Sequence, residues 1–163
     1  MTAKTLKLGN NINTDVIIPG RYLESIDPEE LGRHALEGLD PTFPNKAKEG
    51  VILVAGKNFG CGSSREQAPI ALKSAGVRCI IAESFARIFF RNAINIGLPA
   101  LECEGISRTT SEGDTLSVDL ANGIVANKTT GTVMRATPTP QFILKLIEEG
   151  GLIPHVRALV ERS

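Results

Sequence analysis

The stretch VILVAGKNFGCGSSRE, residues 51–66, decides the fold, because an apolar run of strand length is followed at once by a glycine-rich polar turn. The run Val51–Ala55 is uninterrupted, which is typical of a strand that is buried on both faces. A helix is expected next, near Gln67–Ala75. A strand, a turn and a helix in this order predict the first part of a β–α–β unit with parallel strands.

The alternation continues downstream, with a strand predicted at Arg78–Ala82, a helix at Phe85–Asn95 and a strand at Leu98–Cys103. Four further runs have strand character: Thr5–Leu8, Thr115–Leu120, Ile124–Asn127 and Gly131–Ala136. The pair Asn122-Gly123 indicates a hairpin turn, so the last strands are expected to be antiparallel. The chain is therefore predicted to be α/β, a single domain over residues 1–163 with one mixed sheet.

Three more helices are expected outside this core. The run DPEE at residues 27–30 combines an N-cap residue, a proline at the first helical position and first-turn acids, and Gly38 would end that helix. The other two are expected near the carboxyl end, from Thr139-Pro140 to Gly150 and over Pro154–Glu161. Residues 38–50, between the first of these helices and the strand at Val51, contain two prolines and several charges, which predicts a long surface loop.

The composition narrows the classes of function. The chain has 163 residues, of which 42% are apolar and 22% charged, with 18 basic and 18 acidic side chains. This balance lacks the basic excess that favours nucleic acid or a membrane surface. No apolar run approaches the roughly 20 residues of a membrane span, and the amino terminus has no signal-peptide core. We expect a cytoplasmic protein.

The cysteines suggest neither a zinc site nor a disulfide framework, because there are three of them, widely spaced, with no Cys-x-x-Cys. Cys79 and Cys103 are expected to be small core residues, whereas Cys61 lies in the polar turn. His34 and His155 have no nearby partner in sequence and are expected to be surface or interface residues. Arg87 and Arg91 are one helical turn apart and are expected to face solvent, with a partner as the alternative.

The turn at residues 56–66 carries residue types that can bind an anion. Glycines accept positive φ and let a ligand approach the backbone, and a helix start attracts carboxylate or phosphate. A P-loop does not fit, because its lysine follows the glycines beside Ser or Thr, and no Gly-x-Gly-x-x-Gly is present. A simpler alternative is that Ser63 and Glu66 form a capping box. Pro69 would then lie in the second turn of the helix, where it removes a backbone hydrogen bond.

Three blocks of the sequence resemble the aconitase family. NFGCGSSRE at residues 58–66 is similar to the signature of the swivelling domain of aconitases and of isopropylmalate isomerase small subunits. NTDVIIPGRYL at 13–23 resembles the amino-terminal block of the family, and AESFARIFFRNAINIGLP at 82–99 resembles its second helix block. The resemblance spans residues 5–155 in the family's order. It implies a β/β/α swivelling domain like the aconitase C-terminal domain, here as a stand-alone small subunit.

The resemblance implies a hydro-lyase that dehydrates a 2-hydroxy acid and rehydrates the alkene with the hydroxyl moved. In the family a [4Fe–4S] cluster, held by cysteines of a large subunit, binds the leaving hydroxyl, so a heterodimer or heterotetramer is expected. The expected reaction is the isomerisation of 2- and 3-isopropylmalate in leucine biosynthesis, with homoaconitate or a methylated malate as alternative substrates. Two other classes stay open: a non-catalytic carboxylate-binding regulatory module, and a stand-alone enzyme that uses Cys61.

The resemblance also implies roles for individual residues. Ser63 corresponds to the base that removes the proton next to a carboxylate, and Ser64 and Arg65 correspond to residues that bind substrate carboxylate. Thr14 and Asp15 match a Thr-Asp pair near the family's site, although a turn or an Asx cap explains such a pair equally well.

The loop after Tyr22 is expected to contact the variable side group of the substrate. In the family, members that take tricarboxylates tend to carry an arginine at the position of Glu24. A carboxylate there would repel a further substrate carboxylate by about 3 kcal/mol at about 5 Å and an effective dielectric of about 20. Leu23 or Ile26 could pack on an alkyl group. These residues predict a preference for isopropylmalate, although an apolar residue is more usual at position 24 in relatives that take it.

Overall fold

The computed structural model describes all residues, 1–163, and contains one mixed sheet of seven strands in the order β4-β3-β2-β1-β5-β6-β7. This arrangement confirms the predicted α/β class with a mixed sheet. The strands are β1 Thr2–Lys7, β2 Val51–Ala55, β3 Val77–Ala82, β4 Ala100–Glu102, β5 Thr115–Asp119, β6 Ile124–Asn127 and β7 Val133–Arg135.

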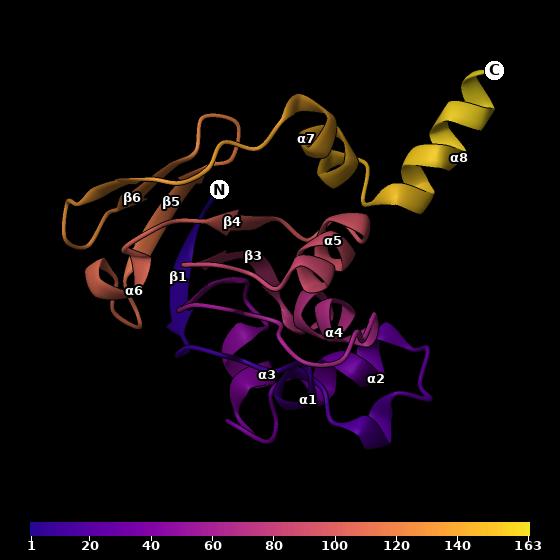
Figure 1. The fold of residues 1–163 in the computed structure, drawn as a ribbon, viewed down its shortest axis with the longest axis horizontal. Helices are drawn as coiled ribbons and strands as arrows, with labels where there is room; N and C mark the ends of the chain where they lie inside the picture. Colours follow the sequence, from indigo (N-terminus) through magenta and orange to yellow (C-terminus); the bar gives the residue numbers. More distant parts are fainter.

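The sheet changes character at β1. Strands β1 to β4 pair in parallel, whereas β5 pairs with the other edge of β1 antiparallel and continues into the β6 and β7 hairpins. The expected hairpin between β5 and β6 is confirmed, since Gly123 has φ +66° and Asn122 donates to the Asp119 carboxylate. Figure 1 shows the antiparallel ribbon β5–β6 on the opposite side of the molecule from α2.

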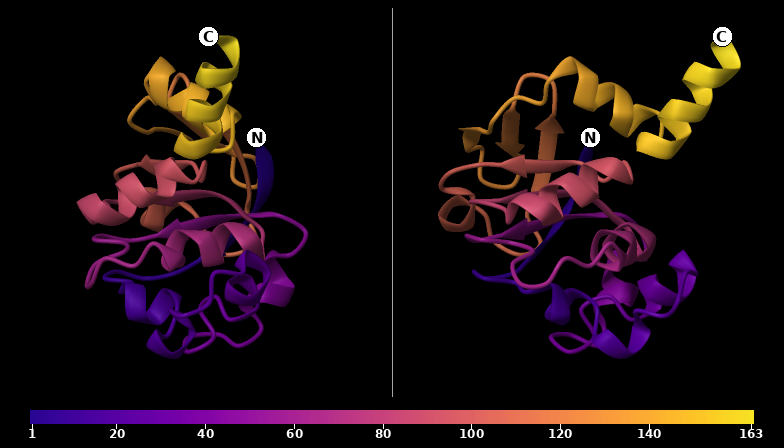
Figure 2. Two further views of the ribbon diagram at one scale, coloured as in Figure 1. Left: turned by 90° about the vertical axis from the view of Figure 1, so that its right-hand side faces the viewer. Right: turned by 45° about the vertical axis from the view of Figure 1, so that its right-hand side comes forward.

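The helices are α1 Thr14–Ile17, the 3-10 turn η1 Gly20–Tyr22, α2 Pro28–Arg33, α3 Phe43–Ala47, α4 Gln67–Ala75, α5 Arg87–Asn95, α6 Ile106–Thr109, α7 Gln141–Glu148 and α8 Leu152–Arg162. Helices α4 and α5 connect the parallel strands, as expected, and α8 leads away from the body of the molecule (Figures 1 and 2). None of the helices has the length and apolar character needed to cross a membrane.

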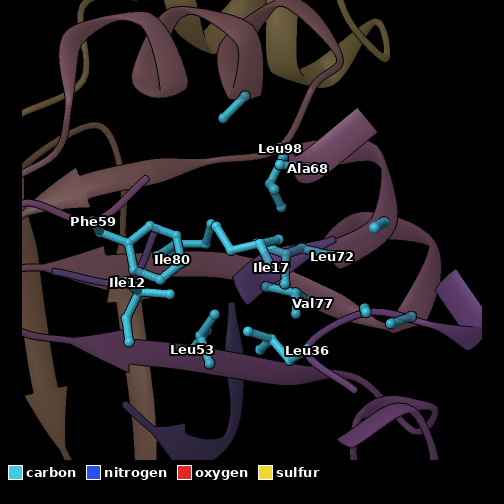
Figure 3. Packing of buried hydrophobic residues seen from close by; sticks show 14 of the residues in the cluster. Ile12, Ile17, Leu36, Leu53, Phe59, Ala68, Leu72, Val77, Ile80 and Leu98 are labelled. Carbon is cyan, nitrogen blue, oxygen red and sulfur yellow. The ribbon is translucent and has the colours of Figure 1, made fainter. Parts of the chain in front are cut away.

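Strand β2 explains why its sequence is apolar at every position. Leu53 belongs to the larger core cluster, between the sheet and α1–α5, whereas Ile52 and Val54 belong to the second cluster on the other face. Successive side chains of a strand point to opposite faces, so a strand covered on both sides needs apolar residues throughout. Figure 3 shows Phe59, at the start of the polar turn, packed into the larger cluster near Ile12.

The segment predicted as a surface loop over residues 38–50 contains helix α3 instead. Phe43 and Ala47 of this helix are buried in the larger core cluster. Asp40 supports the helix start, because its carboxylate accepts hydrogen bonds from the N–H and hydroxyl of Thr42 and from Lys46. The hydrogen bonds from Lys46 and Thr42 lower the pKa of Asp40 to about 2. The helix was not predicted because the segment is mostly polar and only two side chains of the helix are buried.

Helix α2 ends at Arg33, earlier than the predicted stop at Gly38. The chain turns at Leu36, which has φ +55° and is fully buried, and its N–H donates to the carbonyl oxygen of Ile17 at 2.8 Å. Burial of Leu36 against α1 therefore outweighs continuation of the helix, although backbone sterics disfavour a non-glycine residue at positive φ.

The surface prediction was wrong for His155 and incomplete for His34. His155 is 7% exposed, and its Nδ1 lies 2.5 Å from the carboxylate of Glu149, whose pKa this contact lowers. His34 is half-buried and pairs with Glu37 at 2.7 Å. The other surface and core predictions are confirmed: Arg87 and Arg91 are exposed, and Cys79 and Cys103 are buried.

Candidate functional site

The polar turn after β2 is pressed against helix α5 through Gly60. This residue has φ +82°, and a Cβ atom placed on it would lie 2.2 Å from Cγ of Phe89. Its N–H donates to the carbonyl oxygen of Ile12 at 2.8 Å. Phe59 next to it is fully buried and meets Phe89 edge to face, with ring centroids 5.2 Å apart. Only glycine allows the backbone to approach a helix this closely in this conformation.

The amino-terminal block holds the other side of the turn. Asn13 forms an isolated parallel bridge with Cys61, and the N–H of Thr14 donates to the carbonyl oxygen of Cys61 at 2.8 Å. The buried Thr14 hydroxyl donates to the carbonyl oxygen of Ser63 at 2.7 Å. Gly62 has φ +93° and leaves no room for a Cβ beside the Asn13 amide. Two segments far apart in the sequence thus fix the backbone that carries Ser63.

Ser63 does not cap a helix. Helix α4 begins at Gln67, its N-cap is Glu66, and no side chain forms a cap hydrogen bond there. Pro69 therefore lies in the first turn, where its missing N–H breaks no helical hydrogen bond. The capping-box alternative is wrong, and the Ser63 hydroxyl is left exposed without a hydrogen-bond partner in the chain.

Arg65 is held in one orientation by two partners from the amino-terminal block. Its Nη1 donates to the carbonyl oxygen of Ile18 at 2.9 Å, and its Nη2 forms an ion pair with Asp15. The side chain of Arg65 is 15% exposed, whereas that of Asp15 is 58% exposed. A guanidinium has five N–H donors, so these contacts orient the group and leave donors free. Asp15 acts here through Arg65, and its own N–H is bound by the Asn13 side chain in an Asx turn.

A pocket of about 310 Å³ lies between the turn and the start of α5. Four of the predicted site residues line it: Thr14, Ser63, Ser64 and Arg65. The opposite wall comes from α5 and includes two polar side chains that the sequence did not assign to the site, Arg87 and Asn92. The arrangement offers an exposed hydroxyl, a second hydroxyl and guanidinium groups around one small space, which suits a carboxylate-bearing ligand.

Comparison with known proteins shows the family of the chain. The model of the aconitase C-terminal domain family matches residues 33–105. The chain is 58% identical over 160 residues to the 3-isopropylmalate dehydratase small subunit of Caldanaerobacter subterraneus subsp. tengcongensis, covering 98% of this chain and 99% of that one. It is 54% identical over 157 residues to the isopropylmalate/citramalate isomerase small subunit of Methanocaldococcus jannaschii, covering 96% and 94%. The chain belongs to the family of 3-isopropylmalate dehydratase small subunits.

A solved member of the family has the same fold. The crystal structure of 3-isopropylmalate dehydratase from Methanocaldococcus jannaschii matches with a TM-score of 0.90 at 40% identity, over 99% of this chain and 96% of that one. At this similarity the two chains share one fold over nearly their whole length.

The loop that follows the amino-terminal block lies outside the pocket lining. Leu23 packs on the larger core cluster, and its carbonyl oxygen accepts a hydrogen bond from Gln67 at 3.0 Å. Glu24 is exposed and forms no ion pair within the chain, and Ile26 is 95% exposed. Contact of Leu23 and Glu24 with substrate therefore stays a prediction for the assembled family enzyme.

The base of that loop is fixed by Tyr22. Its ring stacks on His34 with centroids 3.9 Å apart, and its hydroxyl donates to the carboxylate of Glu37 at 2.7 Å. Burial raises the pKa of Glu37, but the hydrogen bonds from Tyr22 and His34 outweigh it, so that the net pKa is lowered. A charged Glu37 therefore anchors the base of the loop, and Ser25 ties its tip to Glu30 at 2.7 Å, while Glu24 and Ile26 are exposed.

The cysteines do not form a ligand set for an iron–sulfur cluster. Cys79 and Cys103 are buried in the second core cluster, and burial raises the pKa of their thiols to about 12 and about 11. Cys61 lies apart from both, half-buried in the turn. No group of three potential metal ligands converges anywhere in the chain. The residues of this chain thus do not fit the family's cluster.

A larger depression of the surface, about 780 Å³, lies at the ends of β3 and β4 and holds none of the predicted site residues. Its walls carry charges of both signs, among them Lys57, Glu83, Glu102 and Arg108. Two of the carboxylates already accept backbone hydrogen bonds, Glu83 from Ser107 and Glu102 from Phe85. We therefore place the site at the smaller pocket, where the unpaired serine lies.

Proposed function

We propose that this chain is the small subunit of a 3-isopropylmalate dehydratase, a hydro-lyase that interconverts 2- and 3-isopropylmalate in leucine biosynthesis. Residues 1–163 act as one swivelling domain in a cytoplasmic complex. The observation that carries the proposal is the state of Ser63: its backbone is held by Thr14, it has no helix to cap, and its hydroxyl opens into a pocket beside the oriented guanidinium of Arg65.

In this proposal Ser63 removes the proton next to a substrate carboxylate. A serine hydroxyl is a weak acid, so the alkoxide and the enediolate-like transition state need stabilisation by nearby donors. Arg65 meets this need because two contacts fix its plane and three N–H groups remain. Ser64 and the free N–H groups of Arg65 hold one carboxylate, and Asp15 and Ile18 prevent the guanidinium from turning away.

The chain needs a large subunit. Membership of the family implies a partner that carries the iron–sulfur cluster, and we propose a [4Fe–4S] cluster in a heterodimer or heterotetramer. When bound there, the cluster would supply Lewis-acid chemistry at the substrate hydroxyl. The small subunit would contribute the serine and the carboxylate-binding groups.

A methylated malate is a second candidate substrate. One relative at 54% identity is named an isopropylmalate/citramalate isomerase small subunit, and citramalate differs from isopropylmalate in its alkyl group but shares both carboxylates and the hydroxyl. The pocket groups described above contact these shared features, so they do not separate the two substrates.

The test is reconstitution with a large subunit from the same organism. We expect turnover of 3-isopropylmalate by the complex and none by either subunit alone, with kcat/KM measured in parallel for citramalate and homoaconitate. A stable complex that turns over none of the three would support a regulatory carboxylate-binding module instead. Turnover by this chain alone would support an enzyme that uses Cys61.

A further inference from the structure

The site pocket contains one cation whose charge no carboxylate of the chain neutralises. Two charged side chains line it, Arg65 and Arg87. Arg65 is paired with Asp15. Arg87 is exposed and takes part in none of the ion pairs of the chain. The pair of Arg65 and Asp15 is close to neutral, so the net positive charge of the pocket comes from Arg87.

The structure also fixes Arg87 relative to the serine. Arg87 is the first residue of α5, and Phe89, two residues later, is 3% exposed and packs against Gly60 and Phe59. Because Gly60 is three residues before Ser63 in a turn with close backbone contacts, α5 cannot shift without displacing the turn. The backbone of Arg87 is therefore held on a fixed helix, and its side chain lines the same pocket as Ser63 and Ser64.

The substrates under consideration carry two carboxylates. Arg65 is placed to hold one of them beside Ser63, but its charge is already shared with Asp15. A second carboxylate in a pocket of about 310 Å³ requires a second donor group to replace its hydration. Arg87 comes from α5 and has all its guanidinium donors available, and Asn92, five residues further along α5, adds an amide to the pocket lining.

We propose that Arg87 is a substrate-binding residue that receives the carboxylate of the 2-hydroxy acid not held by Arg65. The inference rests on the proposed function, since it assigns a residue to the same site. It adds a ligand contact to a residue that the sequence predicted to be exposed and that the structure shows to be exposed. Arg91 serves as a matched control because it is on the same helix, equally exposed, and lines neither this pocket nor the adjoining groove.

The experiment compares Arg87→Gln, Arg87→Lys and Arg91→Gln in the assembled two-subunit complex. Loss of a charge-assisted contact to a carboxylate weakens binding by about tenfold to a hundredfold. We expect Arg87→Gln to raise KM for 3-isopropylmalate by that factor with kcat changed less than about threefold. Arg87→Lys should recover part of the loss, because lysine keeps the charge without the planar fork. Arg91→Gln should leave KM unchanged.

A second readout separates this inference from the proposed function. Calorimetric titration of the same complexes with malonate, a bare dicarboxylate, measures carboxylate binding whether or not 3-isopropylmalate is turned over. Weaker malonate binding in Arg87→Gln alone supports the inference even if the true substrate is another hydroxy acid. Unchanged KM and unchanged malonate affinity in Arg87→Gln overturn it. So does an Arg87→Gln defect that disappears when the large subunit is in excess, because the residue would then act in subunit assembly.

Discussion

At the scale of single residues, Ser63 shows how the same motif can serve two purposes. Ser-x-x-Glu before an apolar run is a common helix start, but here three residues outside the helix, Ser64, Arg65 and Glu66, separate Ser63 from the start of α4 at Gln67. The hydroxyl is therefore available for chemistry, while the carbonyl oxygen of Ser63 is held by Thr14. The carbonyl oxygen thus fixes the position of Ser63, and its hydroxyl stays available to a ligand.

Ser63→Ala in the assembled complex should lower kcat by about 10²–10⁴-fold, the usual contribution of a positioned general base. The free energy of unfolding should change little, because the hydroxyl makes no hydrogen bond within the chain. Steady-state kinetics and thermal unfolding of the same preparation check both parts. A helix cap would show the reverse pattern, a loss of about 1 kcal/mol in stability with nearly normal kcat.

Glu24→Arg tests the loop that precedes α2. If Glu24 approaches the variable group of the substrate, the unmodified complex should prefer 3-isopropylmalate over homoaconitate by about a hundredfold, from a repulsion of about 3 kcal/mol. The substitution should narrow the ratio of the two kcat/KM values. Because Glu24 is exposed and unpaired, folding should be unaffected. Equal turnover of homoaconitate by the unmodified complex would contradict the loop interpretation and favour a homoaconitase.

At the scale of elements, the close approach of the turn to α5 depends on Gly60. Gly60→Ala introduces a Cβ that would lie 2.2 Å from Phe89, at φ +82°. Gly113→Ala is a matched control, because Gly113 has φ +91° but nothing within 4 Å of its Cβ position. We expect about 1–2 kcal/mol of destabilisation for Gly113→Ala from backbone strain alone, and at least about 2 kcal/mol more for Gly60→Ala from the clash.

Chemical denaturation measures the free energy of unfolding of both variants, and kcat of the assembled complex provides a second comparison. Gly60→Ala should also lower kcat, since moving the turn moves Ser63, whereas Gly113→Ala should not. Equal losses of stability in the two variants would mean that the turn relaxes freely and that α5 does not hold it.

Helix α3 depends on the ionised carboxylate of Asp40. The folded-state pKa of about 2 is below the ordinary value of 3.8, so the carboxylate contributes stability above about pH 4 and loses that contribution as the pH falls toward about 2. Asp40→Asn should therefore be less stable than the natural chain at neutral pH, and the difference should shrink through this range. Urea midpoints of both proteins from pH 7 downward provide the measurement, and a constant difference would rule the contribution out.

At the scale of the whole molecule, the chain has a well-packed core but no converging set of thiolates. The sheet buries both of its faces, but the two buried cysteines lie in the second core cluster with pKa values raised by burial. Cluster ligation requires thiolates that converge. We expect the purified chain to fold, to contain no stoichiometric iron or sulfide, and to be inactive alone.

Elemental analysis and absorption spectra of the isolated chain check this expectation, and one cluster per chain would contradict it. Cys61→Ala in the complex is the accompanying control. Because Cys61 contributes its carbonyl oxygen to Thr14 rather than its thiol, the variant should keep turnover within about threefold of normal, far from the 10²-fold or greater loss expected for a nucleophile.

Much of the fold can be predicted from short stretches of the sequence. The unbroken apolar run of β2 follows from burial on both faces, and the alternation of strands and helices from residue 51 to 102 follows from short connections that favour parallel pairing. The turn at residues 56–66 was recognisable because its glycines and serines resemble those of a family. Each of these signals is contained in a few consecutive residues, so periodicity and composition are enough to detect it.

Only the tertiary structure decided which segments meet. No local pattern predicted that Thr14 contacts Cys61 and Ser63, or that Arg65 pairs with Asp15. The burial of His155 and of α3 likewise depends on segments that are distant in sequence. Arg87 illustrates the reason. The residues around Arg87 predict only an exposed helix start. Phe89 packs on Gly60 and so positions α5 against the turn, and this long-range contact places Arg87 in the wall of the pocket.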